Sequence, residues 1–356
     1  MKICFFGSYD PYYSRNKILI DGLQKNGAVI FHCLSLKDNF ILRYGELIKR
    51  FWSIQKKVDI LFVAFVGQLN MPLAWFLGKI TGIPVIFDMF YSMYDTYTFD
   101  RQSVKPLSLK AVFYYSIDKL SAILANIVLV DTYANRDYFC QLFSINKSKF
   151  VRIFVGGDDT LFIPPKRTKK GKVITIEFHG MFSRLSGAEY YIEAAKLLEN
   201  EKYMSFLLIG NSGYYKKPIQ LFHKLEPKNM KYLGQLPLKR LAQIVRTSDI
   251  TIGHLGITQK AKNVISNKIF QGIACGNAVI TSDTPAIHEL LTKNQNVLLC
   301  ESGSATDLAR KIRLLVSQVK LRSRIAHNGY NLSERMLSNK YLGKQVLSIC
   351  QKLIEN

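Results

Sequence analysis

Short apolar runs alternate with segments of helical periodicity along this chain, and the alternation occurs twice. In the first half the runs are Lys2–Phe6, Val29–Cys33, Val58–Val66, Pro84–Phe87, Ile127–Val130 and Val151–Val155. In the second half they include Val173–Phe178, Met204–Ile209, Ile250–Gly253 and Ala278–Thr281. Runs of this kind are typical of strands buried on both faces of a parallel sheet. The pattern therefore predicts an α/β protein made of two Rossmann-like, doubly wound halves.

The two halves are separated by a polar, basic segment, Pro165–Gly171, which reads as a linker. A length of 356 residues also suits two domains. We therefore expect a first domain at 1–163, a second at 164–338 and a final helix at 339–356. That last helix is amphipathic, with Leu342, Val346, Leu347, Cys350 and Leu353 on its apolar side.

The six cysteines are scattered, without a CxxC pair, so we expect free thiols and no metal site. No segment reaches the ~18 apolar residues that a membrane span needs. The formal net charge of +23 suits nucleic acid, an anionic membrane surface or anionic substrates. Because no nucleic-acid-binding motif is present and the basic residues are spread through predicted helices, we expect no nucleic acid partner.

The segment Tyr44–Lys57 mixes Phe51 and Trp52 with lysine and arginine, a combination typical of a membrane interface. The alternative is a surface helix whose two aromatic rings pack into the core. On the first interpretation the protein is cytoplasmic and lies peripherally on the inner face of the cell membrane.

The stretch Asn263–Glu289 predicts a polar site. Ser266 and Asn267 can cap a short helix, which the Gly after Cys275 ends. A buried strand follows, and a new helix opens near Pro285 with Glu289 in its early turns. Helix N-termini and the carboxyl ends of strands meet at one edge of such a sheet, so these polar groups surround an anion-sized hole. The alternative is an ordinary αβα unit of any doubly wound domain.

This stretch resembles the nucleotide-sugar site of retaining GT-B glycosyltransferases of family 4, the glycosyl transferases group 1. The matching residues are Asn267, Lys268, Gly272, Ala274, Gly276, Val279, Ile280 and Glu289. A second matching motif runs from Gly180 to Gly187, where Arg184 corresponds to the arginine that binds the donor diphosphate. Residues 156–164 resemble the family's crossing segment between its domains.

The resemblance implies a GT-B fold, with two Rossmann-like domains facing across a cleft and a C-terminal helix that crosses back to the first domain. It implies metal-independent transfer from a nucleotide-diphosphate sugar, without a cofactor, in which Arg184 and Lys268 neutralise the leaving diphosphate. The implied donor-binding residues are Gly180, Gly187, Gly210, His254, Asn263, Ser266, Asn267, Gln271 and Glu289.

The expected acceptor is a polyprenyl-diphosphate-linked glycan or a glycolipid of cell-envelope polysaccharide biosynthesis, bound by the first domain. Arg15, at the start of a helix, is a candidate for an anion; the alternative is a solvated helix residue. Asp95, in the loop after Asp88, is a candidate for the acceptor wall; the alternative is a loop cap.

Several positions depart from the family pattern, among them Ala278 in place of the usual proline. Gln271 replaces the glutamate that holds the ribose hydroxyls, Asn263 replaces an earlier glutamate, and Ser186 replaces a lysine. An amide oxygen accepts hydrogen bonds more weakly than a carboxylate. The alternative function is therefore a degenerate GT-B protein that binds a nucleotide sugar or a partner enzyme without turnover. For an active enzyme, Gln271→Glu is expected to bind the donor as well or better.

Overall fold

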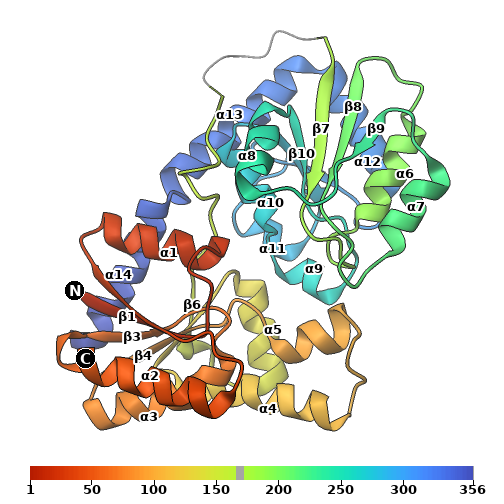
Figure 1. Ribbon diagram of the computed structural model, residues 1–356. Coiled ribbons are helices and arrows are strands. Elements are labelled where there is room, and N and C mark those ends of the chain that lie inside the picture. The colour runs from red at the N-terminus through yellow and green to blue at the C-terminus, as the bar shows by residue number, and fades with distance from the viewer. Residues whose placement is uncertain (166–171, 356) are drawn as a thin grey trace. The chain divides into compact units, whose positions relative to one another are not determined.

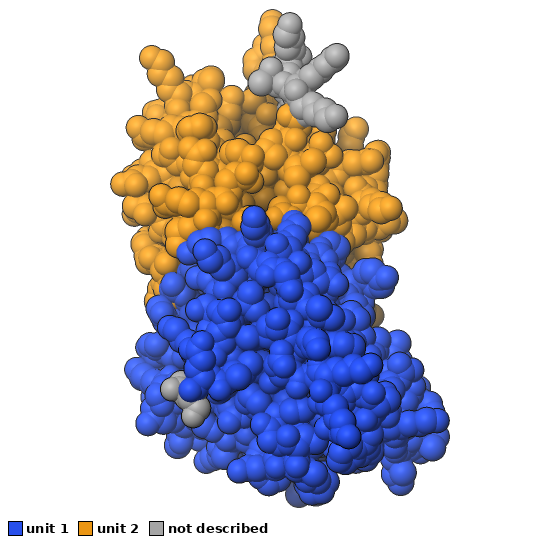
Figure 2. All heavy atoms as spheres, turned by 90° about the vertical axis from the view of Figure 1, so that its left-hand side faces the viewer, with its two compact units in different colours: residues 1–155, 339–356 blue, residues 156–338 orange. Residues whose placement is uncertain are grey.

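The computed structural model describes residues 1–165 and 172–355, so most of the predicted linker lies outside the described residues. The chain divides into two compact units. The first is Met1–Val155 with Asn339–Asn356, and the second is Gly156–Ser338 (Figure 2). Each unit is an α/β domain built on one six-stranded sheet (Figure 1).

The sheet of the first unit has the order β2-β1-β3-β4-β5-β6, and its neighbouring strands are parallel. Its strands are β1 (Lys2–Gly7), β2 (Val29–Leu34), β3 (Ile60–Val63), β4 (Val85–Asp88), β5 (Ile127–Val130) and β6 (Phe150–Arg152). Its α-helices are α1 (Ser14–Lys25), α2 (Phe40–Ile54), α3 (Met71–Thr81), α4 (Leu109–Leu124), α5 (Tyr133–Phe143) and α14 (Asn339–Glu355). Helices α2, α3 and α4 cover the face of the sheet opposite to α1 and α14 (Figure 1).

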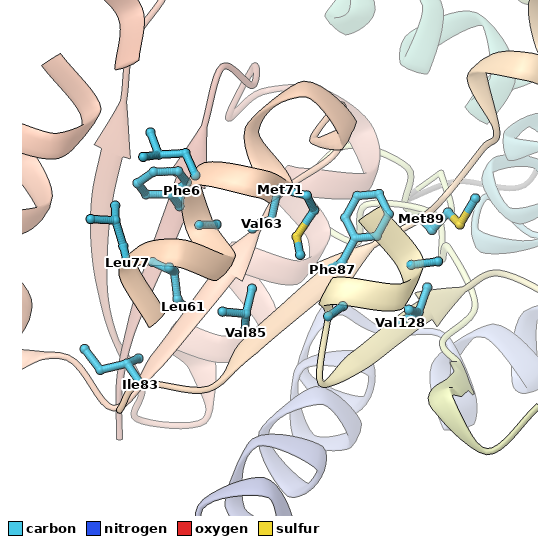
Figure 3. Close-up of a cluster of buried hydrophobic side chains, with 14 of the residues drawn as sticks. Phe6, Leu61, Val63, Met71, Leu77, Ile83, Val85, Phe87, Met89 and Val128 are labelled. Atoms are coloured by element: carbon cyan, nitrogen blue, oxygen red, sulfur yellow. The ribbon is translucent and has the colours of Figure 1, made fainter. Parts of the chain in front are cut away.

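The central strands of this sheet are apolar throughout because helices cover both of their faces. Strands β3 and β4 are buried at every position. Phe6, Val63 and Phe87 from three strands pack with Met71 and Leu77 of α3 in one continuous core (Figure 3). The hydrophobic contact between sheet and helices thus fixes the first unit without a disulfide, and all six cysteines are free and buried.

The C-terminal helix α14 belongs to the first unit and packs against α1. Glycines at the crossing make the close approach of the two backbones possible. A Cβ on Gly22 would lie 2.1 Å from the carbonyl oxygen of Asn339, and one on Gly343 would lie 2.0 Å from the carbonyl carbon of Gly22. Any larger residue at either position would push the helices apart.

The sheet of the second unit has the order β12-β11-β10-β7-β8-β9 and is also parallel. Its strands are β7 (Ile174–His179), β8 (Met204–Ile209), β9 (Met230–Tyr232), β10 (Ile250–Ile252), β11 (Ala278–Ser282) and β12 (Leu298–Cys300). Its helices are α6 (Ala188–Leu197), α7 (Lys217–Leu225), α8 (Leu238–Thr247), α9 (Gln259–Asn263), α10 (Asn267–Ala274), α11 (Pro285–His288), α12 (Ala305–Ser317) and α13 (Val319–Met336). The sequence pattern missed the short edge strand β12.

The units divide between Val155 and Gly156, earlier than the boundary at 163/164 that the sequence suggested. The reason is tight packing of the intervening segment on α10. A Cβ on Gly157 would lie 2.7 Å from the carbonyl oxygen of Phe270. Phe162 is buried against α8 and the end of α10. Residues 156–163 are therefore part of the second unit.

Candidate functional site

The polar site predicted around α10 lies in the second unit, at the carboxyl edge of its sheet. Strands β7, β10 and β11 are neighbours there and end at His179, Ile252 and Ser282. Helix α10 follows β10 in the chain, so its N-terminus lies at the same edge. Lys268, in the first turn of α10, has its Cε 3.8 Å from the position that a Cβ on Gly180 would take. The structure thus brings the Gly180 loop and α10 together.

The loop from Gly180 to Gly187 is held in shape by its own serines. The backbone N–H of Ser183 donates to Ser186 Oγ at 2.8 Å, and Ser186 Oγ donates to the Ser183 carbonyl at 2.7 Å. Ser186 is 2% exposed. The residue that stands in place of the family's lysine therefore has a structural task, because it folds the loop rather than reaching out of it.

Gly187 has a positive φ of +63°, and a Cβ on it would lie 2.6 Å from the backbone nitrogen of Gly256. The two loops are also joined by a hydrogen bond from Leu255 N–H to the Ser186 carbonyl, at 3.0 Å. This close backbone contact explains the glycine and sets the position of Arg184, which lies between Gly180 and Gly187. The Arg184 side chain is exposed and makes no ion pair with a described residue. Its guanidinium is available for an anion.

Lys268 is a buried cation. Its side chain is 7% exposed, and its ammonium lies over the ring of Phe178, 3.6 Å from the centroid. Burial lowers the pKa of Lys268 from 10.5 to about 7, and the negative charge of Glu177 partly offsets the fall. No carboxylate of the described residues lies within ion-pair distance of the Lys268 ammonium. An anionic ligand beside it would favour the charged form.

His254 follows β10 and is fully buried. A backbone hydrogen bond with Ala261, in α9, partly opposes the fall in the pKa of His254 that burial causes. Burial, with a smaller contribution from Lys268, lowers the pKa of His254 to about 4. The ring is therefore neutral at physiological pH, with one donor and one acceptor nitrogen to offer.

Gln271, on α10, is held by a histidine that the sequence did not single out. The Nε2 of His179 lies 2.7 Å from Gln271 Oε1, and its Nδ1 lies 2.7 Å from Glu177 Oε2. The other oxygen of Glu177 accepts a hydrogen bond from Thr251 at 2.6 Å. Glu177 is a charged residue inside a predicted buried strand, between Ile176 and Phe178, and that placement was the sequence signal for this group.

The remaining predicted donor-site residues lie near the same edge. Ser266 occupies the N-cap of α10, but its hydroxyl makes no capping bond and has no partner among the described residues. Asn267 is the first residue of that helix. Asn263 ends α9 and accepts a hydrogen bond from Gln259 at 3.1 Å. Gly210 follows β8, where a Cβ would lie 2.0 Å from the carbonyl oxygen of Gly180.

Glu289 differs from its prediction. Helix α11 covers only Pro285–His288, so Glu289 is its C-cap rather than a residue of its early turns. The backbone N–H of Glu289 donates to the carbonyl of Ala286, as in a tight final turn. Glu289 is partly buried.

The two predicted substrate residues of the first unit do not face solvent. Arg15 is fully buried, pairs with Asp88 at 2.9 Å and also donates to the carbonyl oxygen of Ile153 at 2.7 Å. Its charge is neutralised inside the unit, so the assignment to an anionic ligand is wrong. Asp95 lies in a π-helical turn, 95–100, and accepts a hydrogen bond from Tyr138 at 3.0 Å. At 3% exposed it lines no surface, because the loop folds inward.

Together the exposed guanidinium, the buried ammonium and the uncapped N-terminus of α10 can bind a phosphate or diphosphate group. No group of three or more His, Cys, Asp or Glu side chains within 1–165 and 172–355 could hold a metal ion.

Residues 159–332 match the model of the family described as Glycosyl transferases group 1. The crystal structure of Anabaena HepE, in complex with UDP and glucose, superposes with a TM-score of 0.74 at 15% identity, over 99% of this chain and 100% of that one. The match to the Glycosyl transferases group 1 model lies within the second unit. The fold is GT-B.

Two curated relatives carry glycosyltransferase names. An uncharacterized glycosyltransferase of Methanocaldococcus jannaschii is 25% identical over 158 residues, which is 44% of this chain and 42% of the relative. The N,N'-diacetylbacillosaminyl-diphospho-undecaprenol alpha-1,3-N-acetylgalactosaminyltransferase of Campylobacter jejuni is 23% identical over 203 residues, 56% of this chain and 51% of the relative. The alignments therefore span about half the length of these relatives.

Proposed function

We infer that this protein is a retaining, metal-independent glycosyltransferase of family 4. It moves a sugar, such as a hexose, from a nucleotide-diphosphate sugar to a polyprenyl-diphosphate-linked glycan or a glycolipid of the cell envelope. The observation that carries the proposal is Lys268, a buried ammonium without a carboxylate partner among the described residues, beside a glycine loop that exposes Arg184. The UDP complex of HepE and the lipid-linked acceptor in the name of the Campylobacter jejuni relative support it.

In this reaction the bond between the sugar's anomeric carbon and the diphosphate breaks, and the acceptor oxygen forms the new bond on the same face. Negative charge grows on the leaving diphosphate. Arg184 and Lys268 stabilise that charge, and the low dielectric around Lys268 strengthens its contribution. The diphosphate oxygen takes the acceptor's proton, as the resemblance implies. In this proposal the neutral ring of His254, which follows β10, hydrogen-bonds the donor.

Gln271 supports the alternative function, a degenerate GT-B protein without turnover. A neutral amide, already bonded to His179, stands where the family has a carboxylate. A protein of this kind binds the nucleotide sugar without transferring the sugar.

The experiment that separates the two proposals combines nucleotide binding with turnover. Thermal shift with UDP, GDP and dTDP identifies the nucleotide that binds. A protein that binds none of the three contradicts both the active enzyme and a degenerate protein that binds a nucleotide sugar, and leaves only a degenerate protein that binds a partner enzyme. Slow hydrolysis of the matching sugar donor, or transfer of labelled sugar to a lipid extract, then marks an enzyme. Binding without either reaction marks the degenerate protein.

The first unit offers a surface suited to an anionic membrane. Within 1–165 and 172–355, no helix is long and apolar enough to cross a bilayer. Helices α2, α3 and α4 and the loop before α4 nevertheless expose large apolar side chains: Trp52, Phe76, Ile80, Leu107, Leu109, Val112, Phe113, Leu120 and Ile123. Lys49, Lys79, Lys110 and Lys119 lie on the same helices. Apolar insertion together with lysine contacts to lipid phosphates is how peripheral proteins bind such membranes.

This surface differs from the predicted one. Phe51 is fully buried in the core, whereas Trp52 is 46% exposed. The largest exposure lies at the start of α4, where Leu107 and Leu109 are 90% and 91% exposed. We therefore propose peripheral binding to the inner face of the cell membrane through α2, α3 and α4, rather than through the segment Tyr44–Lys57 alone.

A further inference from the structure

Behind Gln271 the second unit holds a chain of buried polar side chains. Asn277 donates to Thr251 Oγ1 at 3.0 Å, and the Thr251 hydroxyl donates to Glu177 at 2.6 Å. Glu177 and Gln271 then lie on opposite sides of the His179 ring, each 2.7 Å from a ring nitrogen. All five side chains are buried, and they come from β7, β10, α10 and the turn after α10. This hydrogen-bonded network leads from the middle of the sheet to the face of α10 that carries Lys268.

The hydrogen bonds leave little freedom to the members of this chain. Both carboxylate oxygens of Glu177 accept, which suits the ionised form, since an ionised carboxylate offers acceptors alone. Glu177 Oε2 and Gln271 Oε1 are both acceptors, so the Nδ1–H of His179 donates to the first and its Nε2–H donates to the second. A buried network in which each member has its partner is rigid.

Close packing holds the same elements in register. A Cβ on Gly272 would lie 2.7 Å from Thr251, so α10 lies directly against β10 beside the network. A small shift of α10 would therefore break the contact between His179 and Gln271. Gln271, one turn after Lys268 in α10, is thereby fixed relative to the ammonium.

We propose that Glu177 and His179 are positioning residues for nucleotide binding: Glu177 orients the imidazole of His179, and His179 fixes the amide of Gln271 for contact with the nucleotide. The inference rests on the proposed function, because it requires that a nucleoside diphosphate binds at α10. Neither residue touches the reacting atoms. If the network served stability alone, removing His179 would lower the free energy of unfolding but would not change nucleotide affinity through Gln271.

A double-mutant cycle between His179→Ala and Gln271→Ala tests this coupling. The probe is whichever of UDP, GDP and dTDP the wild-type chain binds most tightly, and the measurement is its affinity by calorimetry. We expect each single variant to weaken binding about tenfold, the scale of one hydrogen bond. The double variant should also lose about tenfold, not a hundredfold, because both changes remove the same interaction.

A second cycle, His179→Ala with Arg184→Ala, is the matched control, and its losses should multiply because the two side chains act separately. Thermal unfolding of each variant establishes that it is folded. Should His179→Ala fail to fold, His179→Gln replaces it; its amide can still donate to Gln271, and binding should stay within about threefold of wild type.

The outcomes are distinct. Multiplied losses in the His179/Gln271 cycle, or unchanged affinity in both single variants, overturn the positioning role and leave the proposed function standing. If His179→Gln lowers nucleotide affinity tenfold, and does so equally when Gln271 is replaced by alanine, the loss does not pass through Gln271 and the positioning role is overturned in the same way. A wild-type chain that binds none of the three nucleotides overturns the proposed function, and this inference with it.

Discussion

Lys268→Met should make the protein more stable while it loses its ligand. Methionine matches the length of the lysine and removes its charge. The ammonium is buried, and the described residues supply no carboxylate at ion-pair distance. A charge in that position costs folding energy that an anionic ligand would recover. The prediction therefore separates a lysine kept for binding from one kept for structure.

The magnitude follows from the pKa of Lys268, which falls from 10.5 to about 7. At about 1.4 kcal/mol per pKa unit, and with about half of the folded molecules already neutral at pH 7, this shift costs the folded state about 4 kcal/mol. The contact with the Phe178 ring stabilises the ammonium by up to about 2 kcal/mol. Lys268→Met should therefore raise the free energy of unfolding at pH 7 by about 2–4 kcal/mol.

The pH dependence has a definite sign. Between pH 7 and 10.5 the unfolded chain keeps the proton on Lys268, whereas the folded chain has lost it. The unfolded state binds more protons in this window, so the stability of the wild type rises with pH. The advantage of Lys268→Met should therefore shrink by about 2 kcal/mol between pH 7 and pH 9.

The assay must report on the second unit, because both tryptophans, Trp52 and Trp75, lie in the first. Hydrogen exchange followed by mass spectrometry on peptides of β7 and α10 gives the local opening free energy, and peptides of β1 and β3 serve as internal control. Calorimetry with UDP, GDP and dTDP measures binding, which should weaken at least about tenfold on loss of a charge-assisted contact.

Lys262→Met is the matched control, because Lys262 is an exposed lysine of the neighbouring helix α9. It should change neither stability nor binding appreciably. A Lys268→Met protein that is less stable than the wild type at pH 7, with a difference that does not depend on pH, would refute the argument that Lys268 is a buried and uncompensated charge.

Four further predictions follow. Arg184→Ala should lower glycosyl transfer at least ~100-fold, the scale of one preorganised charge contact; near-normal turnover in the folded variant contradicts its role. Gln271→Glu should bind the nucleotide as well or better in calorimetry, because a carboxylate accepts hydrogen bonds more strongly than the amide oxygen that now lies 2.7 Å from His179; binding weakened tenfold would show that residue 271 does not contact the nucleotide. The fraction of protein that floats with anionic liposomes should fall at 0.5 M salt, since each basic residue contributes ~1 kcal/mol to membrane binding and salt screens that contribution. The fraction should fall further in Leu109→Asp, which replaces an exposed apolar side chain by a charge; flotation that is absent or does not depend on salt counts against the proposed surface. The folded pKa of His254 is about 4, below its ordinary 6.5, so the unfolded state binds more protons between these two pH values. Acid unfolding should therefore begin below pH 6.5, and it should occur at lower pH in His254→Phe. Identical acid titrations of the two proteins would show that the ring does not titrate as argued.

Some features could be predicted from the sequence because they depend on local pattern. Apolar runs such as Pro84–Phe87 are uniform enough to indicate a strand buried on both faces, and the structure places β4 at Val85–Asp88. The motif glycines Gly180 and Gly187 were recognisable from their spacing around Arg184, and the structure gives the reason for them: each takes a positive φ, +111° and +63°, which other residues rarely adopt. The edge strand β12 was missed because three residues carry little periodicity.

Only the tertiary structure decided which charges meet. Arg15 looked like an anion-binding residue at a helix start, but Asp88, far away in the sequence, neutralises it inside the first unit. Gln271 looked like a weak substitute for glutamate, but α10 places it against His179. The ring of His179 is in turn hydrogen-bonded to Glu177, two residues earlier on the same strand β7. Local propensity and motif spacing reside in a few consecutive residues, whereas the charge state and orientation of a buried side chain depend on partners that the chain brings together only by folding.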